Sequence, residues 1–530
     1  MRKIHDELPK FMNTVFGWVA TGEVKHATST PRVSCYLMLV DSLDKAIEKF
    51  WATEELPEKL PCSLEEEDCE NYFCNTFSRN AAGRYIVRYP KRMGFYNIIG
   101  KSRDMAMRGF QQTERRLERD INLRKQYNEF MQEYIDLGHM KLIGVVNDIR
   151  TNERTVCYLP HHAVFKESSS TTKIRVVFDG SAKTSTNYSL NEALLTGPVI
   201  QDDLFDLMVR FRKHTVALVA DVENMYRQIR THPDDTPLQR ILWRFSPSEP
   251  TMEFEIQPVT YGLSPSSFLA TRVLKQMAID SKSEHSETAL AIEEDFYMDD
   301  FLSGADSVEK AKRLQVDVQT ILAKGGFQLR KWSSNKPGVL EDLLAEAVDN
   351  TTKLHHEQPV KVKTLEGVWE IKSDCLSIEV HATNDNIQWT KRKICSEIAK
   401  LYNPLGLVSP VVAWAKICLQ HVWLAAGDWD DVVPDEINTK WSNFYSQLPF
   451  LHGFKVSRFI FAADSTVTQF HVFCDASEVG YGACMYARTV ERDGQANVKL
   501  IASKACGTVE KSVITTLRAR RCTFGSQIVC

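Results

Sequence analysis

An apolar run at residues 215–221, TVALVAD, constrains the fold more than any other feature of the sequence. Its β-branched and aliphatic side chains do not alternate with polar ones, which is typical of a strand that is buried on both faces. Such a strand lies inside a sheet, so the sequence predicts an α/β or α+β body. The run ends in Asp221, and open sheets place ligands at the C-terminal ends of their strands.

A second segment, EEDFYMDDFLSGA at residues 293–305, has Asp299 and Asp300 between two apolar stretches. The pattern predicts a tight β-hairpin with two adjacent acids at its tip. Like charges this close are costly unless a cation lies between them. If the two strands are neighbours, Asp221 and Asp299 converge, and their oxygens suit two Mg²⁺ ions roughly 3.5 to 4 Å apart. One ion would lower the pKa of an attacking hydroxyl and the other would hold a triphosphate.

An Asp-Asp pair alone carries little information, because most such pairs lie in surface turns. Other pairs begin at Asp202, Asp234 and Asp430. The pair at Asp299 differs from them in its strand-turn-strand context and in its position 78 residues after an apolar strand that ends in an acid.

The rest of the sequence predicts alternating helices and strands. Residues 103–137 carry apolar side chains at helical spacing, and Gly138 is suited to the end of that helix. A polar stretch with proline and glycine at 333–359 indicates a linker around a short helix. We also expect strands near 173–179, 241–245 and 470–487, a strand pair near 367–380, and helices at 265–279, 307–326 and 391–423.

Composition fits a packed globular protein. The 530 residues allow roughly three to five domains. Apolar residues at 43% and charged residues at 25% exclude a wholly disordered, collagenous or coiled-coil chain. No apolar run approaches the ~18 residues of a membrane helix, so we expect an intracellular protein without a membrane partner. The 13 cysteines include no CxxC pair, which favours free thiols and no structural metal.

The net charge of -4 hides a segregation of charge along the chain. Residues 79–141 hold fourteen basic and seven acidic side chains, whereas residues 54–70 are strongly acidic. Whole-chain charge therefore neither supports nor excludes a nucleic-acid partner, and a basic stretch is often only a solvated helix face.

The acid-ended run at 215–221 and the later Tyr297-Met298-Asp299-Asp300 resemble motifs A and C of reverse transcriptases, in the same order. Over most of its length the chain resembles the Pol polyprotein of BEL/Pao-type LTR retrotransposons. The segments that carry this resemblance are FGWVATG, EKFWATEELPEK, LGHM, YLPHHAVFK, KIRVVFDGSAKTSTNYSLNEALLTGP, LVADVENMYRQIR, VTYGLSPSSFLATRVL, FYMDDFLSGADS, GGFQLRKWSSN, AKLYNPLGLVSPV and HVFCDASEVGYGA.

The resemblance implies an α+β fold, a right-hand polymerase with fingers, palm and a thumb-like or connection region, followed by a truncated RNase H-like α/β unit. The implied divisions are a remnant after a lost aspartic protease domain (1–55), an acidic linker and basic helical region (56–137), reverse transcriptase fingers and palm (138–335), a Pao-type thumb-like or connection region (336–465) and a truncated RNase H-like fragment (466–530).

The resemblance also implies catalytic roles. Asp221 and Asp299 would bind two Mg²⁺ or Mn²⁺ ions, assisted by the main-chain carbonyl of Val222. Asp300 would be a weaker accessory acid. Lys331 matches the region that supplies a proton to the departing pyrophosphate.

Further residues match positions around the nucleotide. Tyr226 matches an aromatic steric gate that stacks under the sugar and excludes a 2′-hydroxyl; the alternative is a core aromatic of a short helix. Tyr261 and Gly262 match a template-facing loop, where glycine lets the backbone approach the nascent base pair; the alternative is a turn before a helix. Trp332 matches a turn that grips the primer.

Three cations match the hairpin of the fingers that grips the triphosphate: Lys166, Lys173 and Arg175. Arg175 is best suited to this role, because a guanidinium pairs with phosphate in a bidentate manner. Either lysine could instead be a solvated charge on an edge strand.

The resemblance is incomplete at both ends of the chain. Neither Asp-Thr-Gly nor Asp-Ser-Gly occurs, since Asp179-Gly180-Ser181 has the wrong order, so we expect no aspartic protease activity. Asp475 matches the first RNase H carboxylate, but the Leu-Glu-Leu helix of the family does not follow. We therefore expect a degenerate RNase H site without activity. Residues 515–530 lack apolar periodicity, and we expect a frameshift or gene-model error there.

The leading prediction is an RNA-directed DNA polymerase that binds an RNA or DNA template-primer and dNTPs. The resemblance implies a cytoplasmic location, in a virus-like particle with access to the nucleus. A second reading is an inactive nucleic-acid-binding relic of a retrotransposon Pol. A third is the peptidase label attached to this family, against which the missing protease tripeptide argues.

Overall fold

The computed structural model describes residues 10–14, 17–21, 62–146, 156–165, 174–344, 347–349, 361–364, 367–380, 387–425, 427–462, 465–477 and 480–507. The chain forms two compact units, Met1–Phe50 and Trp51–Cys530. In the first unit, β1 (Lys10–Thr14) and β2 (Gly17–Thr21) pair as an antiparallel hairpin. The other residues of the segment at 1–55, predicted to follow a lost aspartic protease domain, lie outside the described residues.

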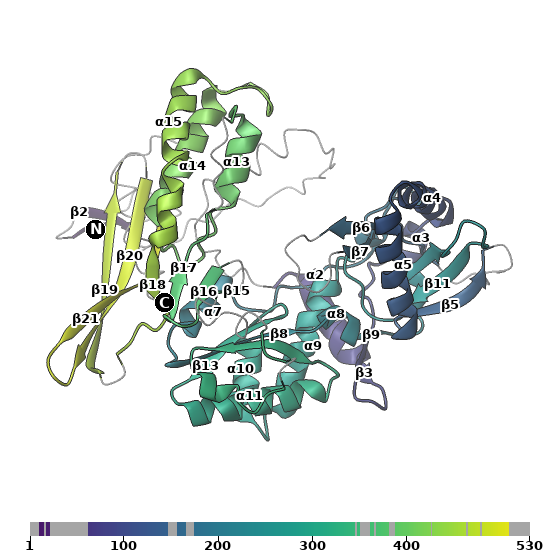
Figure 1. Cartoon of the computed structure of the whole chain (residues 1–530), viewed down its shortest axis with the longest axis horizontal. Helices are drawn as coiled ribbons and strands as arrows, with labels where there is room; N and C mark the ends of the chain where they lie inside the picture. The colour runs from purple at the N-terminus through teal and green to yellow at the C-terminus, as the bar shows by residue number, and fades with distance from the viewer. Residues whose placement is uncertain are drawn as a thin grey trace. The chain divides into compact units, whose positions relative to one another are not determined.

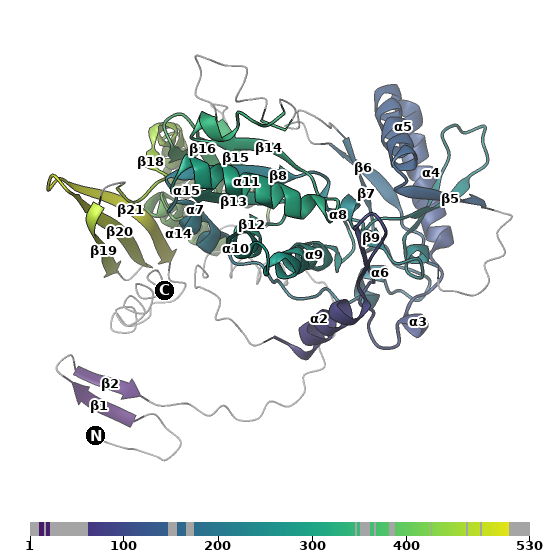
Figure 2. The same ribbon diagram turned by 90° about the horizontal axis from the view of Figure 1, so that it is seen from below.

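The central feature of the second unit is a four-stranded antiparallel sheet (Figures 1 and 2). Its strands, in spatial order, are β12 (Phe296–Tyr297), β13 (Asp300–Ala305), β8 (Val216–Val222) and β14 (Leu329–Ser334). The strand predicted from TVALVAD is therefore an interior strand. The hairpin predicted from EEDFYMDDFLSGA is present as β12 and β13.

Alternate residues of β8 enter two different cores, which explains why its sequence does not alternate between apolar and polar. The even-numbered residues from Val216 to Val222 share one core with α9 (Ser266–Ser281), α10 (Ser286–Glu294) and α11 (Val308–Ala323). Ala217 and Val219 share a second core with α7 (Leu204–Phe211). Burial on both faces makes β8 a fixed base for the side chain of Asp221 at its end.

A second group of elements lies at the right of Figure 1 and includes the helices of the predicted basic region. The single helix predicted over residues 103–137 is wrong: the structure has α4 (Arg103–Arg119) and α5 (Ile121–Asp136). Asp120 separates them, because its extended backbone ends α4 and its carboxylate accepts a hydrogen bond of 2.9 Å from Leu123 N at the start of α5. Gly138 follows α5 with a positive φ of 64°, as expected for the end of a helix.

The strands packed near these helices form a three-stranded sheet, a hairpin and a smaller sheet. The three-stranded sheet contains β10 (Arg240–Trp243), β11 (Met252–Ile256) and β5 (Met140–Val145). The hairpin contains β6 (His161–Phe165) and β7 (Ile174–Phe178). The smaller sheet contains the shorter strands β3 (Ser78–Arg79), β4 (Tyr85–Val87) and β9 (Arg230–Thr231). The short helices are α2 (Leu64–Thr76), α3 (Phe95–Ile98), α6 (Leu190–Ala193) and α8 (Met225–Gln228).

The described residues of the C-terminal part form two further sheets and three α-helices. One sheet is formed by β15 (Lys361–Thr364), β16 (Gly367–Glu370), β17 (Cys375–Ser377) and β18 (Lys455–Ser457). The other has β19 (Ser465–Ala476), β20 (Gly480–Glu491) and β21 (Ala496–Gly507). The helices are α13 (Lys391–Ala399), α14 (Ser409–Ala425) and α15 (Asp435–Tyr445).

A loop with the sequence YNPLGLVSP attaches this last sheet to its neighbours. Gly406 has a positive φ of 69°, and a Cβ atom there would lie 1.5 Å from the main-chain oxygen of Ser503 on β21. The amide of Ser503 donates in turn to the oxygen of Leu405 at 2.9 Å. Leu405 itself is buried in the core that contains α7. The glycine of this motif therefore permits a close backbone contact.

Two buried arginines connect the central sheet to the C-terminal strands. Arg212, just after α7, is fully buried and donates to the main-chain oxygens of residues 457, 458, 500 and 501. Burial, and then the charge of Arg458, lower the pKa of Arg212 to about 9. Arg458 is also fully buried and binds both carboxylate oxygens of Asp374, at 2.7 and 2.9 Å. Sequence analysis did not identify these contacts.

Candidate functional site

Three acids lie at one end of the central sheet. Asp221 stands directly opposite Asp300 in the register of β8 and β13. The amide of Val222 donates to the main-chain oxygen of Asp299 at 2.8 Å, which holds the hairpin tip against the end of β8. Met298 has a positive φ of 54°, so the turn between β12 and β13 is tight. The structure therefore brings Asp221, Asp299 and Asp300 together at the sheet end where the sequence predicted them.

The electrostatics of this cluster reflect the proximity of its charges. Surrounding protein atoms partly desolvate the accessible carboxyl of Asp299, and this burial, followed by the charge of Asp221, raises its pKa. The positive charges of Lys331 and Arg175 act in the opposite direction. Two carboxylates and two cations thus influence one another at the end of the sheet.

Lys331 is the cation closest to Asp221, with its Nζ 2.6 Å from Asp221 Oδ2. Burial alone would lower the pKa of Lys331, but the hydrogen bond and charge of Asp221, with the charges of Asp300 and Asp349, raise it. Lys331 has a positive φ of 56° at an irregularity of β14. This irregularity directs Lys331 to the acids and buries the side chain of Trp332 completely, while the place of Trp332 in a primer-gripping turn stays a prediction.

The donor chemistry of the acids suits a divalent cation only in part. Carboxylate oxygens are ligands that Mg²⁺ prefers, and Asp221 with Asp299 supplies two of them. Within the described residues, no group of three or more His, Cys, Asp or Glu side chains is arranged to hold a metal ion. One oxygen of Asp221 is also engaged by the ammonium of Lys331. A cation bound here would depend on the Asp221–Asp299 pair, main-chain oxygens and water.

Aromatic and cationic side chains line one flank of the acid cluster. The guanidinium carbon of Arg175, on β7, lies 5.6 Å from the centre of the Tyr261 ring. The rings of Tyr226 and Tyr261 meet edge to face, 6.0 Å apart, and the hydroxyl of Tyr226 lies 3.2 Å from that of Ser267. Burial, together with the charge of Asp299, raises the pKa of Tyr226, while Arg175 acts to lower it. Arg175, Tyr226 and Asp299 are therefore close enough to influence one another electrostatically.

Gly262 holds the loop before α9 against β7. Its φ is +98°, and a Cβ atom there would lie 2.2 Å from the main-chain oxygen of Phe178. The side chain of Asn191 donates to the oxygen of Gly262 at 2.9 Å and accepts from the amide of Ser264 at 2.9 Å. The glycine is thus required for contact between this loop and the strand that carries Arg175.

Three predicted site residues remain: Lys166, Lys173 and Asp475. Lys166 and Lys173 lie outside the described residues. Asp475 is an exposed residue near the end of β19, and the amide of Ala476 donates to its carboxylate at 2.9 Å. The hairpin predicted for its strand is present, since β19 and β20 pair from Ser465 to Ala476.

Sequence analysis missed two ion pairs at the acid cluster. Arg330 binds Glu223 at 2.7 Å, and Lys331 binds Asp221. The alternation of β14 would have placed these two neighbouring cations on opposite faces, so an irregular strand was needed to bring both to the end of β8. A positive φ at a lysine leaves no clear signal in a single sequence.

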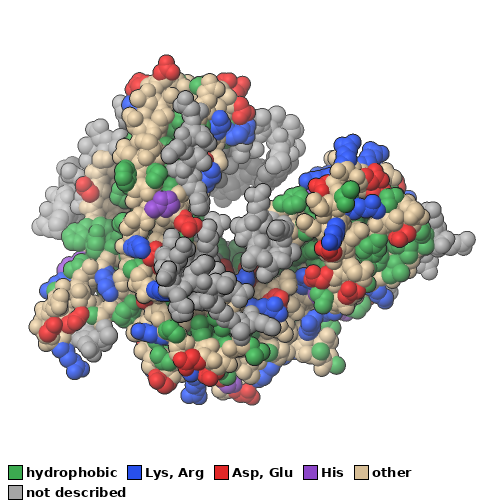
Figure 3. Space-filling view, viewed as in Figure 1, with side chains coloured by type: hydrophobic (Ala, Val, Ile, Leu, Met, Phe, Trp, Pro, Cys, Tyr) green, Lys and Arg blue, Asp and Glu red, His purple; other side chains and the backbone are tan. Residues whose placement is uncertain are grey.

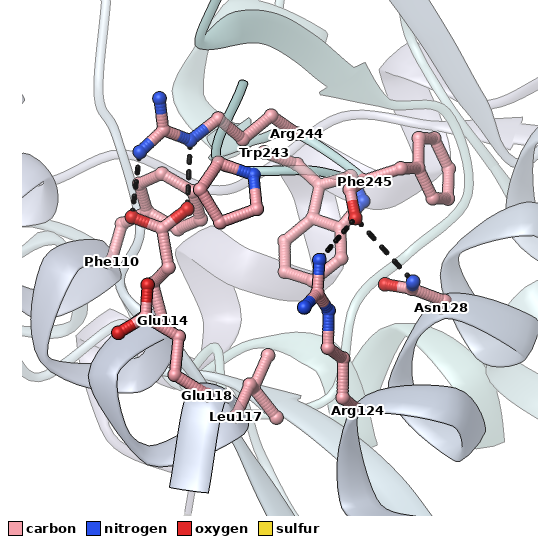
Figure 4. A pocket seen from close by; sticks show the side chains of 10 residues that line it. Phe110, Glu114, Leu117, Glu118, Arg124, Asn128, Trp243, Arg244 and Phe245 are labelled. Atoms are coloured by element: carbon pink, nitrogen blue, oxygen red, sulfur yellow. Dashed lines mark hydrogen bonds and ion pairs between the residues drawn. The ribbon is translucent and has the colours of Figure 1, made fainter. Parts of the chain in front are cut away.

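A separate pocket lies between α4, α5 and the turn after β10 (Figure 4). Arg244 binds both oxygens of Glu114 at 2.7 Å, and Arg124 and Asn128 both donate to the main-chain oxygen of Phe245 at 3.5 Å. None of the acids of the cluster lines this pocket. These contacts hold the ends of the two helices against the β10–β11 hairpin.

The predicted basic region lies beside this pocket. Lys and Arg side chains gather over the part of the surface formed by α4 and α5 (Figure 3). Arg115, Arg116 and Arg119 on α4 are exposed. Acidic residues such as Glu118 and Glu129 lie on the same two helices, so the surface is mixed in charge.

Comparison with known proteins identifies a relation in the C-terminal part. Residues 390–521 match the family model of the Pao retrotransposon-like RNaseH-like domain. The match covers α13 to α15 and the sheet of β19 to β21. It supports a protein related to the Pol polyproteins of Pao/BEL retrotransposons. No curated protein matches the chain.

The matched range begins well before residue 466, where the sequence predicted the RNase H-like fragment to start. Contacts within the range are consistent with a single unit, because α14 lies against β21 and Ser503 bonds to the loop before α14. The boundaries of the predicted domains remain predictions. No helix among the described residues is long and apolar enough to cross a membrane.

Proposed function

We propose that the chain is an RNA-directed DNA polymerase of a Pao-type LTR retrotransposon, which extends a primer on an RNA or DNA template. The observation that carries the proposal is the meeting of Asp221, at the end of an interior strand, with Asp299 at the tip of the adjacent hairpin. The match of residues 390–521 to a retrotransposon domain supports the same family by an independent part of the chain.

The reaction would join the 3′-oxygen of the primer to the α-phosphorus of a dNTP, while the bond to pyrophosphate breaks. Two Mg²⁺ or Mn²⁺ ions, when bound, would lower the pKa of the primer hydroxyl and neutralise the phosphates. Asp221 and Asp299 would hold these ions, with the carbonyl of Val222 and with Asp300 as an accessory acid. Lys331 would donate a proton to the departing pyrophosphate.

The flank of the site would bind the nucleotide. Arg175 would pair with phosphate oxygens, because a guanidinium binds phosphate in a bidentate manner. Tyr226 would lie under the sugar, where its ring would collide with a 2′-hydroxyl. Tyr261 and Gly262 would support the templating base pair. Lys166 and Lys173 would add positive charge at the triphosphate.

Incorporation of dTTP on oligo(dT) annealed to poly(rA), with Mg²⁺ or Mn²⁺, tests the proposal. We expect extension that requires the divalent ion and stops in EDTA. A parallel gel-shift measurement with the same template-primer separates the second candidate function from the first. Binding without incorporation would identify a nucleic-acid-binding relic, a reading favoured by the lysine that already neutralises Asp221.

A further inference from the structure

Lys331 and a divalent cation would compete for the same group, the carboxylate of Asp221. Its Nζ is 2.6 Å from Asp221 Oδ2, and Mg²⁺ binds carboxylate oxygen at about 2.0–2.1 Å. A cation on the same carboxylate would come within a few ångströms of the ammonium. At that distance the repulsion between a double and a single positive charge is strong, even at the effective dielectric constant of a protein surface.

The two partners of the ion pair, Lys331 and Asp221, can separate. The side chain of Lys331 is 59% exposed, whereas that of Asp221 is 24% exposed. An ion pair at an accessible edge contributes little net stability, because water can replace either partner. Lys331 can therefore move into solvent while Asp221 stays fixed at the end of β8.

The backbone aims the lysine at the acids. Residues with a Cβ atom rarely adopt a positive φ, and Lys331 adopts one at the irregularity of β14. The buried ring of Trp332 anchors the next residue in the core. A lysine surrounded only by water would not need this conformation. The backbone at Lys331 therefore directs its ammonium toward Asp221.

We infer that Lys331 is a resident counter-ion of the acid cluster, and that Lys331 and a divalent cation exclude each other at Asp221. This inference rests on the proposed function, because it concerns the same carboxylates. Binding of the cation releases the ammonium, and loss of the ammonium tightens binding of the cation, since coupling between two sites is reciprocal. Lys331 thereby sets the concentration of metal at which the site fills.

Binding of Mn²⁺ to the full chain, without nucleotide and followed by the electron paramagnetic resonance signal of free Mn²⁺, tests the inference. Lys331→Met removes the charge and keeps a flexible chain, and we expect it to tighten binding about tenfold, within the usual range of coupling between sites. Lys331→Arg keeps the charge and should bind Mn²⁺ like the wild type. Arg330→Met is the matched control, because Arg330 pairs with Glu223, and it should change affinity less than threefold.

A second measurement uses the wild-type protein and does not depend on the folding of a variant. Acetylation of Lys331 by an N-hydroxysuccinimide ester, quantified by mass spectrometry, should increase at least threefold when Mn²⁺ saturates the site. Unchanged or weaker Mn²⁺ binding by Lys331→Met, or labelling of Lys331 that Mn²⁺ does not increase, would overturn the inference. Asp221→Asn should abolish the Mn²⁺ binding; if it does not, the proposed metal site itself is wrong.

Discussion

At the scale of single residues, the site depends on side chains that the backbone holds in unusual conformations. Met298 and Lys331 both have positive φ values, and they flank Asp221 from the hairpin and from β14. Such conformations persist only where the surrounding structure imposes them. In this protein the buried β8 and the fully buried Trp332 supply that constraint.

Tyr226 should govern the choice between ribonucleotides and deoxyribonucleotides. Replacing Tyr226 with valine removes the ring next to Tyr261 and should raise the ratio of ribonucleotide to deoxyribonucleotide incorporation at least tenfold, because steric exclusion is lost. Steady-state kcat/KM values for UTP and dTTP on the same template measure this ratio. Tyr226 is only half-buried, so Tyr226→Val should remain folded; a variant that unfolds instead would identify a core residue.

Asp299 should destabilise the metal-free protein as pH rises. Its pKa is raised in the folded state, so the stability it contributes is fully present below its ordinary value of 3.8 and is lost as pH rises through the raised pKa. In EDTA, Asp299→Asn should therefore unfold at a higher temperature than the wild type at pH 8, with a smaller difference at pH 4.5.

Asp430→Asn is the control for that measurement. Its hydrogen bond to Arg392 lowers the pKa of Asp430, which is the opposite direction. Asp430→Asn should not gain thermal stability at pH 8. A gain of equal size in both variants would show that the effect of Asp299→Asn reflects only reduced net charge.

At the scale of elements, the buried strand was predictable because its apolar run is long and ends in an acid, and the hairpin because two adjacent acids separate its apolar stretches. The acids Asp221 and Asp299 could be paired from sequence because each marks the end of a strand or hairpin. The break between α4 and α5 was not predictable from periodicity, because apolar residues continue on both sides of Asp120. The position of Lys331 depends on a strand irregularity, and the contacts of Arg212 join residues far apart in the chain; neither leaves a local pattern.

The cap at Asp120 should be needed for the two-helix arrangement. Asp120→Ala removes the acceptor of the Leu123 amide and should lower the free energy of unfolding by about 1 kcal/mol. Asp136→Ala is the matched control, because Asp136 is an exposed residue at the other end of α5, where loss of an acid should cost nothing. Urea denaturation of both variants gives the comparison; equal stabilities would mean that Asp120 does not cap the helix.

At the scale of the whole molecule, buried charge joins the central sheet to the C-terminal strands. Arg212 is bonded to four main-chain oxygens on or next to β18 and β21, and Arg458 donates to the oxygen of Phe211 at the end of α7. Removing a partner from a buried ion pair leaves an uncompensated charge. The C-terminal region related to retrotransposon RNase H-like domains is thus fixed to the elements that carry the acid cluster.

Asp374→Asn should show how strongly the stability of the protein depends on the buried ion pair with Arg458. It removes the negative charge that Nε and Nη2 of the buried Arg458 bind. It should therefore lower the free energy of unfolding by about 3 kcal/mol. The pair of Arg392 with Asp430 has the same bidentate geometry but is exposed, so Asp430→Asn should change stability little. Comparable losses in both variants, measured by urea denaturation, would contradict a special role for the buried pair.

In the proposed function Asp221 and Asp299 act as one polymerase site, and single-turnover primer extension on an RNA template measures the activity of that site. Asp221→Asn and Asp299→Asn should each reduce the rate of dNTP incorporation at least a thousandfold while leaving template-primer binding unchanged, because in the proposed function each carboxylate would hold the catalytic ions. Asp430→Asn, in another Asp-Asp pair, should retain the wild-type rate. Incorporation by Asp299→Asn at the wild-type rate would contradict the account.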